Sequence, residues 1–469
     1  MTEFDLPDDE LEEEWNEPEP EWESGFRRAE SSGRPRALLV AIETPHSIWD
    51  AATSLEELEI LCEAAGLEPV GSVTQRLPHP HPNRYVGSGK LQEIRERLAM
   101  DAVDVVVTDD ELAPRQLATL EKELNHKVID RTSVILDIFA QRASTHEGRI
   151  QVELAQYEFM LPRLQTIWEE FDRTGGGIGT RGPGETQLEH DRQRIRTRIS
   201  QLKREIEHVR EHRERVRKRR RQGGMPLVAL VGYTNVGKTS LLRALTSASN
   251  ARASDAPFVT LDPLTRVMEL DGGLPVLISD TVGFISKLPH TVVAAFRATL
   301  EELSEADLLL HVIDVTDSRA EICADIVRET LKELGLDEKP VLLALNKADA
   351  ASIGEVLRLH DRFKRESSGP EFEPVVTSAE TGEGLGILKA VIERWASARS
   401  PWVHVCVPYQ RSDLVDLFYR RGHPVRTNYD ERGTEIEGNL PTSLVRIFSP
   451  FMVADASPAP LPKPNRAAS

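Results

Sequence analysis

The sequence predicts an α/β protein, with a long helical hairpin between two α/β domains. Three apolar runs look like buried strands, at 37–42, 71–77 and 103–108. Helical segments at 55–65 and 89–98 separate them, and this alternation is typical of parallel sheets. The alternation resumes after Gly223-Gly224 and continues to about residue 400. We therefore expect a small α/β domain over 36–140 and a larger one over 225–400.

The segment between these domains, 141–222, has the spacing of two long helices. Apolar residues recur in steps of three and four, which places them on one helix face. They are Ile150, Leu154, Tyr157, Leu161, Leu164 and Trp168, and later Leu188, Ile195, Ile199, Leu202, Ile206, Val209 and Val216, with Arg192 and Arg213 filling two positions. Residues 174–184 are rich in glycine and should not be helical. We expect an antiparallel hairpin with a glycine-rich tip, kinked at Pro162.

The two ends of the chain differ from this core. Residues 1–35 are mostly Glu, Asp and Pro, so we expect an acidic disordered tail, and a second disordered tail at 456–469. Between 401 and 455, short strands and a helix near 413–420 predict a small α+β domain.

Composition narrows the class of protein. No apolar run approaches the ~18 residues of a membrane-spanning helix, and the N-terminus lacks the layout of a signal peptide. The three cysteines, Cys62, Cys323 and Cys406, form no CxxC pair, which argues against a disulfide framework or a zinc site. We expect a cytoplasmic protein without a membrane span.

The charge is unevenly distributed. The net charge is −19, but residues 1–30 hold thirteen acidic and two basic side chains. Residues 191–221 hold fourteen Lys and Arg against five Asp and Glu. A helix this basic suits RNA phosphates, although a solvated coiled-coil surface is the alternative. The candidate contacts are Arg192, Arg194, Arg196, Arg198, Lys203 and Arg204, with Arg181 in the tip.

A phosphate-binding loop follows the strand at 227–231. It matches GxxxxGK[ST] and consists of Gly232, Tyr233, Thr234, Asn235, Val236, Gly237, Lys238 and Thr239. A helix follows immediately, and its N-terminus favours an anion. Lys238 is expected to reach the β- and γ-phosphates and so to act in catalysis, and the Thr239 hydroxyl is expected to bind Mg²⁺.

Three further motifs follow in the order of a guanine-nucleotide site. A strand ends in DxxG, whose residues are Asp280, Thr281, Val282 and Gly283. Asp280 is expected to hold Mg²⁺ through water, and the Gly283 N–H to meet the γ-phosphate during catalysis. NKxD follows another strand as Asn346, Lys347, Ala348 and Asp349, with Asp349 reading the ring N–H and amine of guanine. Ser378, Ala379 and Glu380 follow a last strand and complete the base site, where the Ala379 N–H is expected to meet the base oxygen. Together these motifs predict a P-loop GTPase that uses GTP and Mg²⁺.

The switch segment between these motifs contains Phe258, Val259, Thr260, Leu261 and Asp262. Thr260 is expected to bind Mg²⁺ and the γ-phosphate, with Thr265 as the alternative. Phe284 follows DxxG and cannot polarise water, so a partner or another side chain such as His290 must do so. We expect slow intrinsic hydrolysis and no catalytic role for His290.

Several other runs resemble the HflX family of the Obg–HflX superfamily. They are 85–90 (YVGSGK), 128–132 (VIDRT), 135–143, 145–148 (THEG), 153–156 (ELAQ) and 175–188, and the resemblance covers about 37–451. It implies a translation-factor-related GTPase that binds the large ribosomal subunit and can split ribosomes under stress. It also implies ATP binding by the N-terminal part, for which Gly87-Ser88-Gly89-Lys90 is a candidate, although a simple helix start explains that run equally well.

Two functions therefore remain open. The first is a ribosome-activated GTPase that splits or rescues ribosomes. The alternative is a GTP-gated assembly factor or scaffold that binds ribosomal particles without splitting them. A metabolic kinase is disfavoured, because NKxD selects guanine.

Overall fold

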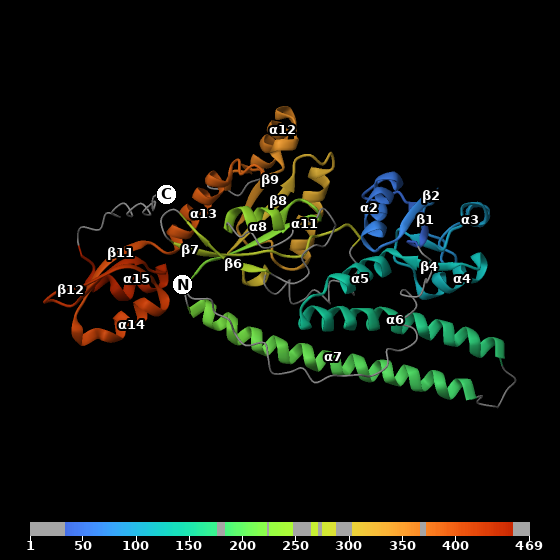
Figure 1. Ribbon diagram of the computed structural model, residues 1–469, viewed down its shortest axis with the longest axis horizontal. Helices are drawn as coiled ribbons and strands as arrows, with labels where there is room; N and C mark the ends of the chain where they lie inside the picture. Colours follow the sequence, from blue (N-terminus) through green and yellow to red (C-terminus); the bar gives the residue numbers. More distant parts are fainter. Residues whose placement is uncertain are drawn as a thin grey trace.

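The computed structural model describes residues 33–175, 183–222, 225–246, 264–270, 274–287, 303–365 and 372–453. They form three β-sheets and a pair of long helices, in the predicted chain order (Figure 1). The six-stranded sheet lies between the other two sheets, and the helix pair extends from below it to below the four-stranded sheet (Figure 1). The α/β fold class is confirmed. Most of both predicted tails falls outside the described residues.

The N-terminal unit, residues 36–142, is a parallel sheet covered on both faces. Its elements are β1 (Arg36–Glu43), α2 (Ala51–Ala64), β2 (Glu68–Arg76), α3 (Ser88–Asp101), β3 (Val105–Thr108), α4 (Pro114–Leu124), β4 (Lys127–Asp130) and α5 (Arg131–Arg142). The strands lie in the order β2-β1-β3-β4. Leu39 and Ala41 of β1 share a core with α2 and α5, whereas Leu38 and Val40 pack in the core that holds α3 and α4. Alternate residues of β1 therefore serve opposite faces.

The hairpin consists of α6 (His146–Gly175) and α7 (Pro183–Gln222), which lie side by side (Figure 1). Eight residues of the predicted seam pack together: Ile150, Leu154, Tyr157, Leu161, Ile195, Ile199, Leu202 and Ile206. Another face of α6 packs on the N-terminal unit through Val152, Ala155 and Phe159. The seam prediction is confirmed for these eight. The side chains of Leu164, Trp168, Leu188, Arg213 and Val216 lie outside the described residues.

The tip of the hairpin is shorter than predicted. The expectation that residues 174–184 are all non-helical is wrong at both ends, since α6 includes Thr174 and Gly175 and α7 begins at Pro183. Proline suits the first turn of a helix, because the N–H that it lacks has no partner within the helix there. α6 also continues through Pro162. Residues 176–182, with Arg181, lie outside the described residues.

The nucleotide unit, residues 225–400, is the six-stranded sheet with its helices. Its elements are β5 (Leu227–Gly232), α8 (Lys238–Thr246), β6 (Thr265–Glu269), β7 (Pro275–Ser279), β8 (Leu308–Asp314), α11 (Ala320–Glu333), β9 (Val341–Asn346), η1 (Ala348–Ala350), α12 (Ile353–Lys364), β10 (Val375–Val376) and α13 (Leu385–Arg399). The strand order is β10-β9-β8-β5-β7-β6, and only β6 runs antiparallel to its neighbour in this sheet. The carboxyl ends of the five parallel strands therefore lie along one edge, where ligands of such sheets bind.

The C-terminal unit, residues 401–453, is a small antiparallel sheet with two helices. It contains β11 (Trp402–Val407), η3 (Tyr409–Arg411), α14 (Ser412–Arg421), β12 (His423–Tyr429), β13 (Thr434–Asn439), α15 (Thr442–Phe448) and η4 (Ser449–Phe451). Phe418 and Phe448 meet edge to face, with ring centres 5.5 Å apart. This contact holds α14 and α15 together. The predicted helix near 413–420 is α14, and α15 was not predicted.

Candidate functional site: a guanine-nucleotide pocket

The phosphate-binding loop joins β5 to α8 as its sequence requires. Gly237 has a φ of +90°, and a Cβ there would lie 2.5 Å from Nδ2 of Asn346. Both facts exclude a side chain at this position. The Asn346 amide donates to the carbonyl of Val236 at 2.9 Å and so fixes the loop from a neighbouring strand. The loop is thus tied to the base-reading motif.

Lys238 lies at the centre of the loop and is buried. Its Nζ donates to the carbonyl oxygens of Gly232 at 3.1 Å and Tyr233 at 2.7 Å. Burial lowers the pKa of Lys238 to about 8, although the nearby Asp280 carboxylate opposes this shift. A phosphate beside Nζ would favour the charged form of the amine.

Two oxygen ligands suited to Mg²⁺ meet beside the loop. The Thr239 hydroxyl donates to Oδ2 of Asp280 at 2.6 Å, so the ends of α8 and β7 converge there. Hydroxyl and carboxylate oxygens are the hard donors that Mg²⁺ prefers, usually with waters and nucleotide phosphates completing its shell. The pair therefore fits a nucleotide-bound Mg²⁺. No group of three or more His, Cys, Asp or Glu side chains placed to hold a metal occurs in the described part of the chain.

The DxxG segment lies directly against the phosphate-binding loop. Thr281 is buried and donates through its hydroxyl to the carbonyl of Leu230 at 2.6 Å. A Cβ on Gly283 would lie 2.9 Å from Cα of Thr234 and 3.0 Å from Nζ of Lys238. Only glycine permits this approach. The side chain of Phe284 is buried in the core, which agrees with the expectation that it does not orient water.

The residues predicted to read the base gather at the carboxyl ends of β9 and β10. The Asp349 carboxylate is exposed in η1, and Lys347 forms an ion pair with Asp314 at 2.7 Å. The N–H of Ala379 donates to Oδ1 of Asn346 at 3.1 Å. This N–H, predicted to meet the base oxygen, is therefore engaged within the protein here. Ser378 is buried and Glu380 is exposed beside it.

Part of the predicted site lies outside the described residues. This applies to Phe258, Val259, Thr260, Leu261 and Asp262, and to His290. The alternative switch residue, Thr265, belongs to β6, and its hydroxyl lies 3.2 Å from that of Ser279. Strand pairing thus fixes Thr265 beside β7.

Comparison with known proteins identifies the family. Three family models match in succession: "GTP-binding GTPase N-terminal" at 52–140, "GTP-binding GTPase Middle Region" at 142–220 and "50S ribosome-binding GTPase" at 227–347. GTPase HflX of Lacrimispora saccharolytica is 44% identical over 410 residues, 87% of this chain and 94% of that protein. The chain belongs to the HflX family. It is therefore a GTPase, which hydrolyses GTP.

A second HflX relative gives the same result. GTPase HflX of Escherichia coli is 42% identical over 368 residues, covering 78% of this chain and 84% of that protein. A crystal structure of a GTP-binding protein from Sulfolobus solfataricus in complex with GDP is 25% identical, covering 78% of this chain and 99% of that one, at a TM-score of 0.41. The identities to the two HflX proteins and the three family models confirm the resemblance inferred from the sequence motifs.

The basic face of this HflX protein is partly neutralised within the hairpin. Arg198 forms a bidentate pair with Glu153 of α6, at 2.7 and 3.0 Å, and Lys203 pairs with Glu158 at 2.8 Å. Arg194, Arg196 and Arg204 are exposed, and Arg192 is half-buried. Of the six side chains of α7 that are predicted to bind RNA, Arg198 and Lys203 therefore also hold the two helices together.

The glycine-rich run at 87–90 forms the beginning of α3. The N–H of Gly87 donates to Oε1 of Gln75 at 2.9 Å, and Lys90 pairs with Glu93 at 2.6 Å. These contacts agree with the simple helix start weighed from the sequence. No helix in the described part of this chain is long and apolar enough to cross a membrane.

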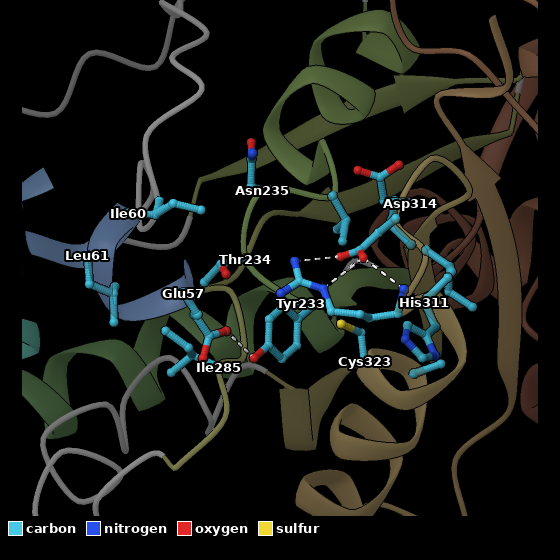
Figure 2. A pocket seen from close by; sticks show the side chains of 17 residues that line it. Glu57, Ile60, Leu61, Tyr233, Thr234, Asn235, Ile285, His311, Asp314 and Cys323 are labelled. Carbon is cyan, nitrogen blue, oxygen red and sulfur yellow. Dashed lines mark hydrogen bonds and ion pairs between the residues drawn. The ribbon is translucent and has the colours of Figure 1, made fainter. Parts of the chain in front are cut away.

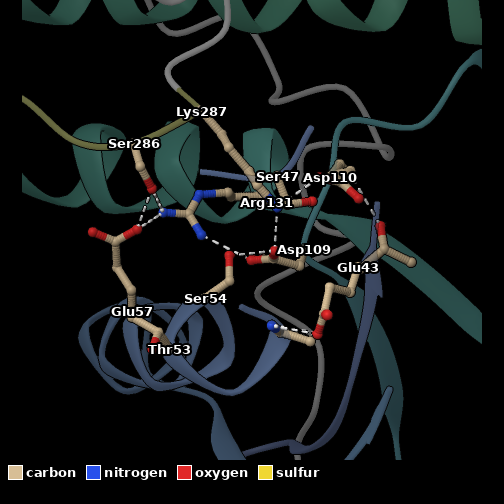
Figure 3. A network of polar contacts seen from close by, with 12 residues as sticks. Glu43, Ser47, Thr53, Ser54, Glu57, Asp109, Asp110, Arg131, Ser286 and Lys287 are labelled. Atoms are coloured by element: carbon tan, nitrogen blue, oxygen red, sulfur yellow. Dashed lines mark hydrogen bonds and ion pairs between the residues drawn. The ribbon is translucent and has the colours of Figure 1, made fainter. Parts of the chain in front are cut away.

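A polar network that was not predicted from the sequence lies between the N-terminal and nucleotide units (Figure 3). Arg131, which begins α5, is fully buried and pairs with Asp109 at 2.9 Å and with Glu57. Glu57 accepts a hydrogen bond from the Tyr233 hydroxyl of the phosphate-binding loop. The available signal was the charged pair Asp130-Arg131 between the apolar runs 128–129 and 134–136, where charges need partners.

A pocket lies behind the phosphate-binding loop at this junction. Figure 2 shows Glu57 of α2 pointing at Tyr233, with Asp314 and Cys323 on the opposite wall. Burial raises the pKa of Cys323 to about 12, so this thiol stays protonated. The pocket joins the two units next to the predicted phosphate site.

Proposed function

We propose that this chain binds the large ribosomal subunit and splits or rescues ribosomes under stress, with GTP hydrolysis stimulated by the ribosome. The observation that carries the proposal is the presence, in one chain, of a GTPase site and a long hairpin whose exposed arginines face outward. The matching description "50S ribosome-binding GTPase" supports the choice of partner. The proposed partner would place its action in the cytoplasm.

The roles of the nucleotide-site residues are part of this proposal. The positions of Lys238, Thr239 and Asp280 around one point support phosphate and Mg²⁺ binding. Mg²⁺, when bound, would neutralise charge on the transferring phosphoryl group. Gly283 would contact the γ-phosphate, Thr260 would complete the metal site, and Asp349 would read guanine.

The hairpin is proposed to probe ribosomal RNA with its tip. Arg194, Arg196 and Arg204 are available for phosphates. The ion pairs of Arg198 and Lys203 with α6 support a stiff hairpin that can carry the tip into a narrow cavity.

A ribosome profile on a sucrose gradient tests the proposal. Intact ribosomes are mixed with the protein and GTP, GDP or a non-hydrolysable GTP analogue. We expect free subunits to increase with GTP and with the analogue, and the protein to move with the large subunit. Binding to the large subunit without any change in the subunit ratio would instead favour the assembly factor.

ATP binding by the N-terminal unit is a separate prediction, drawn from the family resemblance. Its test is the binding of labelled ATP to Lys238→Ala protein, in which the GTP site is impaired. Retained binding that Lys90→Ala abolishes would support ATP binding at the beginning of α3, and no binding would reject it.

A further inference from the structure

Helix α7 carries a surplus of positive charge over most of its length. Residues 191–221, the basic stretch of α7, contain fourteen Lys and Arg against five Asp and Glu. Like charges this close along one helix repel each other, and an anionic partner relieves that repulsion. The basic stretch therefore favours contact with a polyanion.

Helix α6 neutralises only part of this basic stretch. Its sequence includes six Asp and Glu and three Arg, and two of its glutamates pair with α7, at 2.7 and 2.8 Å. Arg194, Arg196 and Arg204 are exposed and have no ion-pair partner among the side chains that the structure describes. These three arginines are therefore available to an anion from outside the hairpin.

The same chain contains a polyanion. Residues 3–23, the acidic segment, contain twelve Asp and Glu and no Lys or Arg. Carboxylates accept the same paired N–H bonds from arginine as phosphates do. Trp15 and Trp22 occur among these carboxylates, and an indole ring also attracts a guanidinium group. The chemistry of the acidic segment therefore matches an arginine-rich surface.

The acidic segment is long enough to reach α7. The chain enters the N-terminal unit at β1, which begins at Arg36, and α6 packs on that unit while it also packs along α7. The 40 residues of α7 span roughly 60 Å. Residues 3–35 reach roughly 110 Å when extended. One chain can therefore bring the acidic segment and the basic stretch together.

We propose that the acidic segment binds the basic stretch of α7 in the same chain and competes there with RNA. Because the two are tethered, the segment acts at a high effective concentration. RNA that offers only backbone phosphates must displace it and so binds weakly, whereas RNA that also fits the hairpin tip gains contacts that the segment does not block. The contact itself is independent of the nucleotide site and of the ribosome; only the competition rests on the proposed binding of RNA by α7.

Energy transfer within the chain tests the contact in the absence of RNA. Fluorophores are attached at Asn16→Cys in the acidic segment and at Gln201→Cys, an exposed position of α7. Cys62 and Cys323 are buried, so the background is Cys406→Ser. We expect strong transfer at ~50 mM salt and loss of most of it at ~1 M, because salt screens the charges. In a neutral variant, whose twelve acidic residues are changed to Gln or Asn, transfer should be weak at both salt concentrations; equal transfer in parent and neutral variant at low salt would overturn the proposal.

Two controls locate the contact. The second fluorophore is moved to Ile353→Cys, an exposed position of α12 on the opposite side of the nucleotide unit from α7 (Figure 1), where transfer should be weaker and should not change with salt. Arg194→Glu with Arg204→Glu should lower the transfer to Gln201→Cys, because the acidic segment meets like charges. Unchanged transfer in this double variant, or transfer between chains that each carry one fluorophore, would contradict a contact with α7 of the same chain.

Binding of a uridine oligomer of about 30 nucleotides tests the competition, since this RNA offers phosphates without any ribosomal sequence. At ~50 mM salt we expect the neutral variant to bind it about 10-fold more tightly than the parent, and the two affinities to agree within about twofold at ~0.5 M. Equal affinities at low salt would overturn the competition. If neither protein binds the oligomer, the proposed RNA role of α7 fails, whereas energy transfer still decides the contact within the chain.

Discussion

At the residue scale, the proposed selection of guanine assigns that role to one exposed carboxylate. Asp349 lies in η1 just beyond β9, while Asn346 beside it is buried and occupied with the loop and Ala379. Within this motif Asn346 therefore holds the loop and Ala379 in place, whereas Asp349 is accessible to a base. A buried or bridging role for Asp349 would not fit its exposure.

Changing Asp349 to Asn should therefore invert base selection. The amide keeps the size of the side chain but replaces an acceptor with a donor, which suits the extra carbonyl of xanthine. We expect GTP affinity to fall by about 100-fold or more, because the guanine donors lose their partner, and xanthosine triphosphate to bind better than GTP. Competition between the two nucleotides measures this. An unchanged GTP affinity would refute the role of Asp349.

Nucleotide affinity should also depend on pH through Lys238. Its pKa of about 8 means that the amine loses its proton as the pH rises above that value. Bound phosphate favours the charged amine, so binding above about pH 8 takes up a proton and weakens with pH, by up to about tenfold per unit. GDP affinity from about pH 7 to about pH 8.8 measures this. Lys238→Arg keeps its charge and should show a flat profile, and a flat parent profile would contradict the prediction.

At the scale of elements, the sequence predicted the features that depend on neighbouring residues, namely the strands and the motifs that follow them. The motif residues Lys238, Asp280 and Asp349 follow strands that alternation already revealed. The polar network between the N-terminal and nucleotide units was missed because its members are far apart in the sequence: Glu57 and Ser286 are separated by 229 positions, and Arg131 and Ser286 by 155. Only the packing of the two units brings them together. Helix α15 was missed because the segment 444–448 is too short for the spacing of its apolar residues to distinguish a helix from a strand.

The apolar seam between α6 and α7 should stabilise the hairpin. Leu202 is fully buried between α6 and α7. Leu202→Ala should lower the free energy of opening of the hairpin by about 2–5 kcal/mol. Hydrogen exchange of the α6 and α7 amides measures this. Gln201→Ala, at the exposed neighbouring position, is the control and should change little; equal protection in both variants would show that the seam is not the stabilising contact.

The exposed arginines should carry the salt dependence of RNA binding. Arg194→Ala with Arg196→Ala should weaken binding to large subunits and reduce the slope of log affinity against log salt by about 0.7–0.9 for each phosphate that is no longer neutralised. The control removes a whole internal pair, Arg198→Ala with Glu153→Ala, and should leave this slope closer to the parent's. A parent-like slope in the variant with Arg194→Ala and Arg196→Ala would show that these two arginines do not neutralise RNA phosphates.

At the scale of the whole molecule, one chain links a nucleotide pocket to a distant tip. The nucleotide unit lies beside the N-terminal unit, and α6 packs on that unit while α7 leads back to β5 (Figure 1). Two connections therefore link the tip to residues 283–287: the chain itself, through α7 and β5, and the packing of α6 on the N-terminal unit. These connections are the physical basis for expecting hydrolysis to respond to the ribosome.

The most direct test is GTP turnover, with and without large ribosomal subunits, after residues 176–182 are replaced by a short neutral turn. The replaced residues lie in the hairpin and the phosphate-binding loop in a separate unit, so intrinsic turnover should stay within about twofold of the parent. Stimulation by large subunits should disappear, because docking would no longer position the switch segments. Full stimulation in the variant would show that the tip is not needed for the response to the ribosome and only connects the two helices.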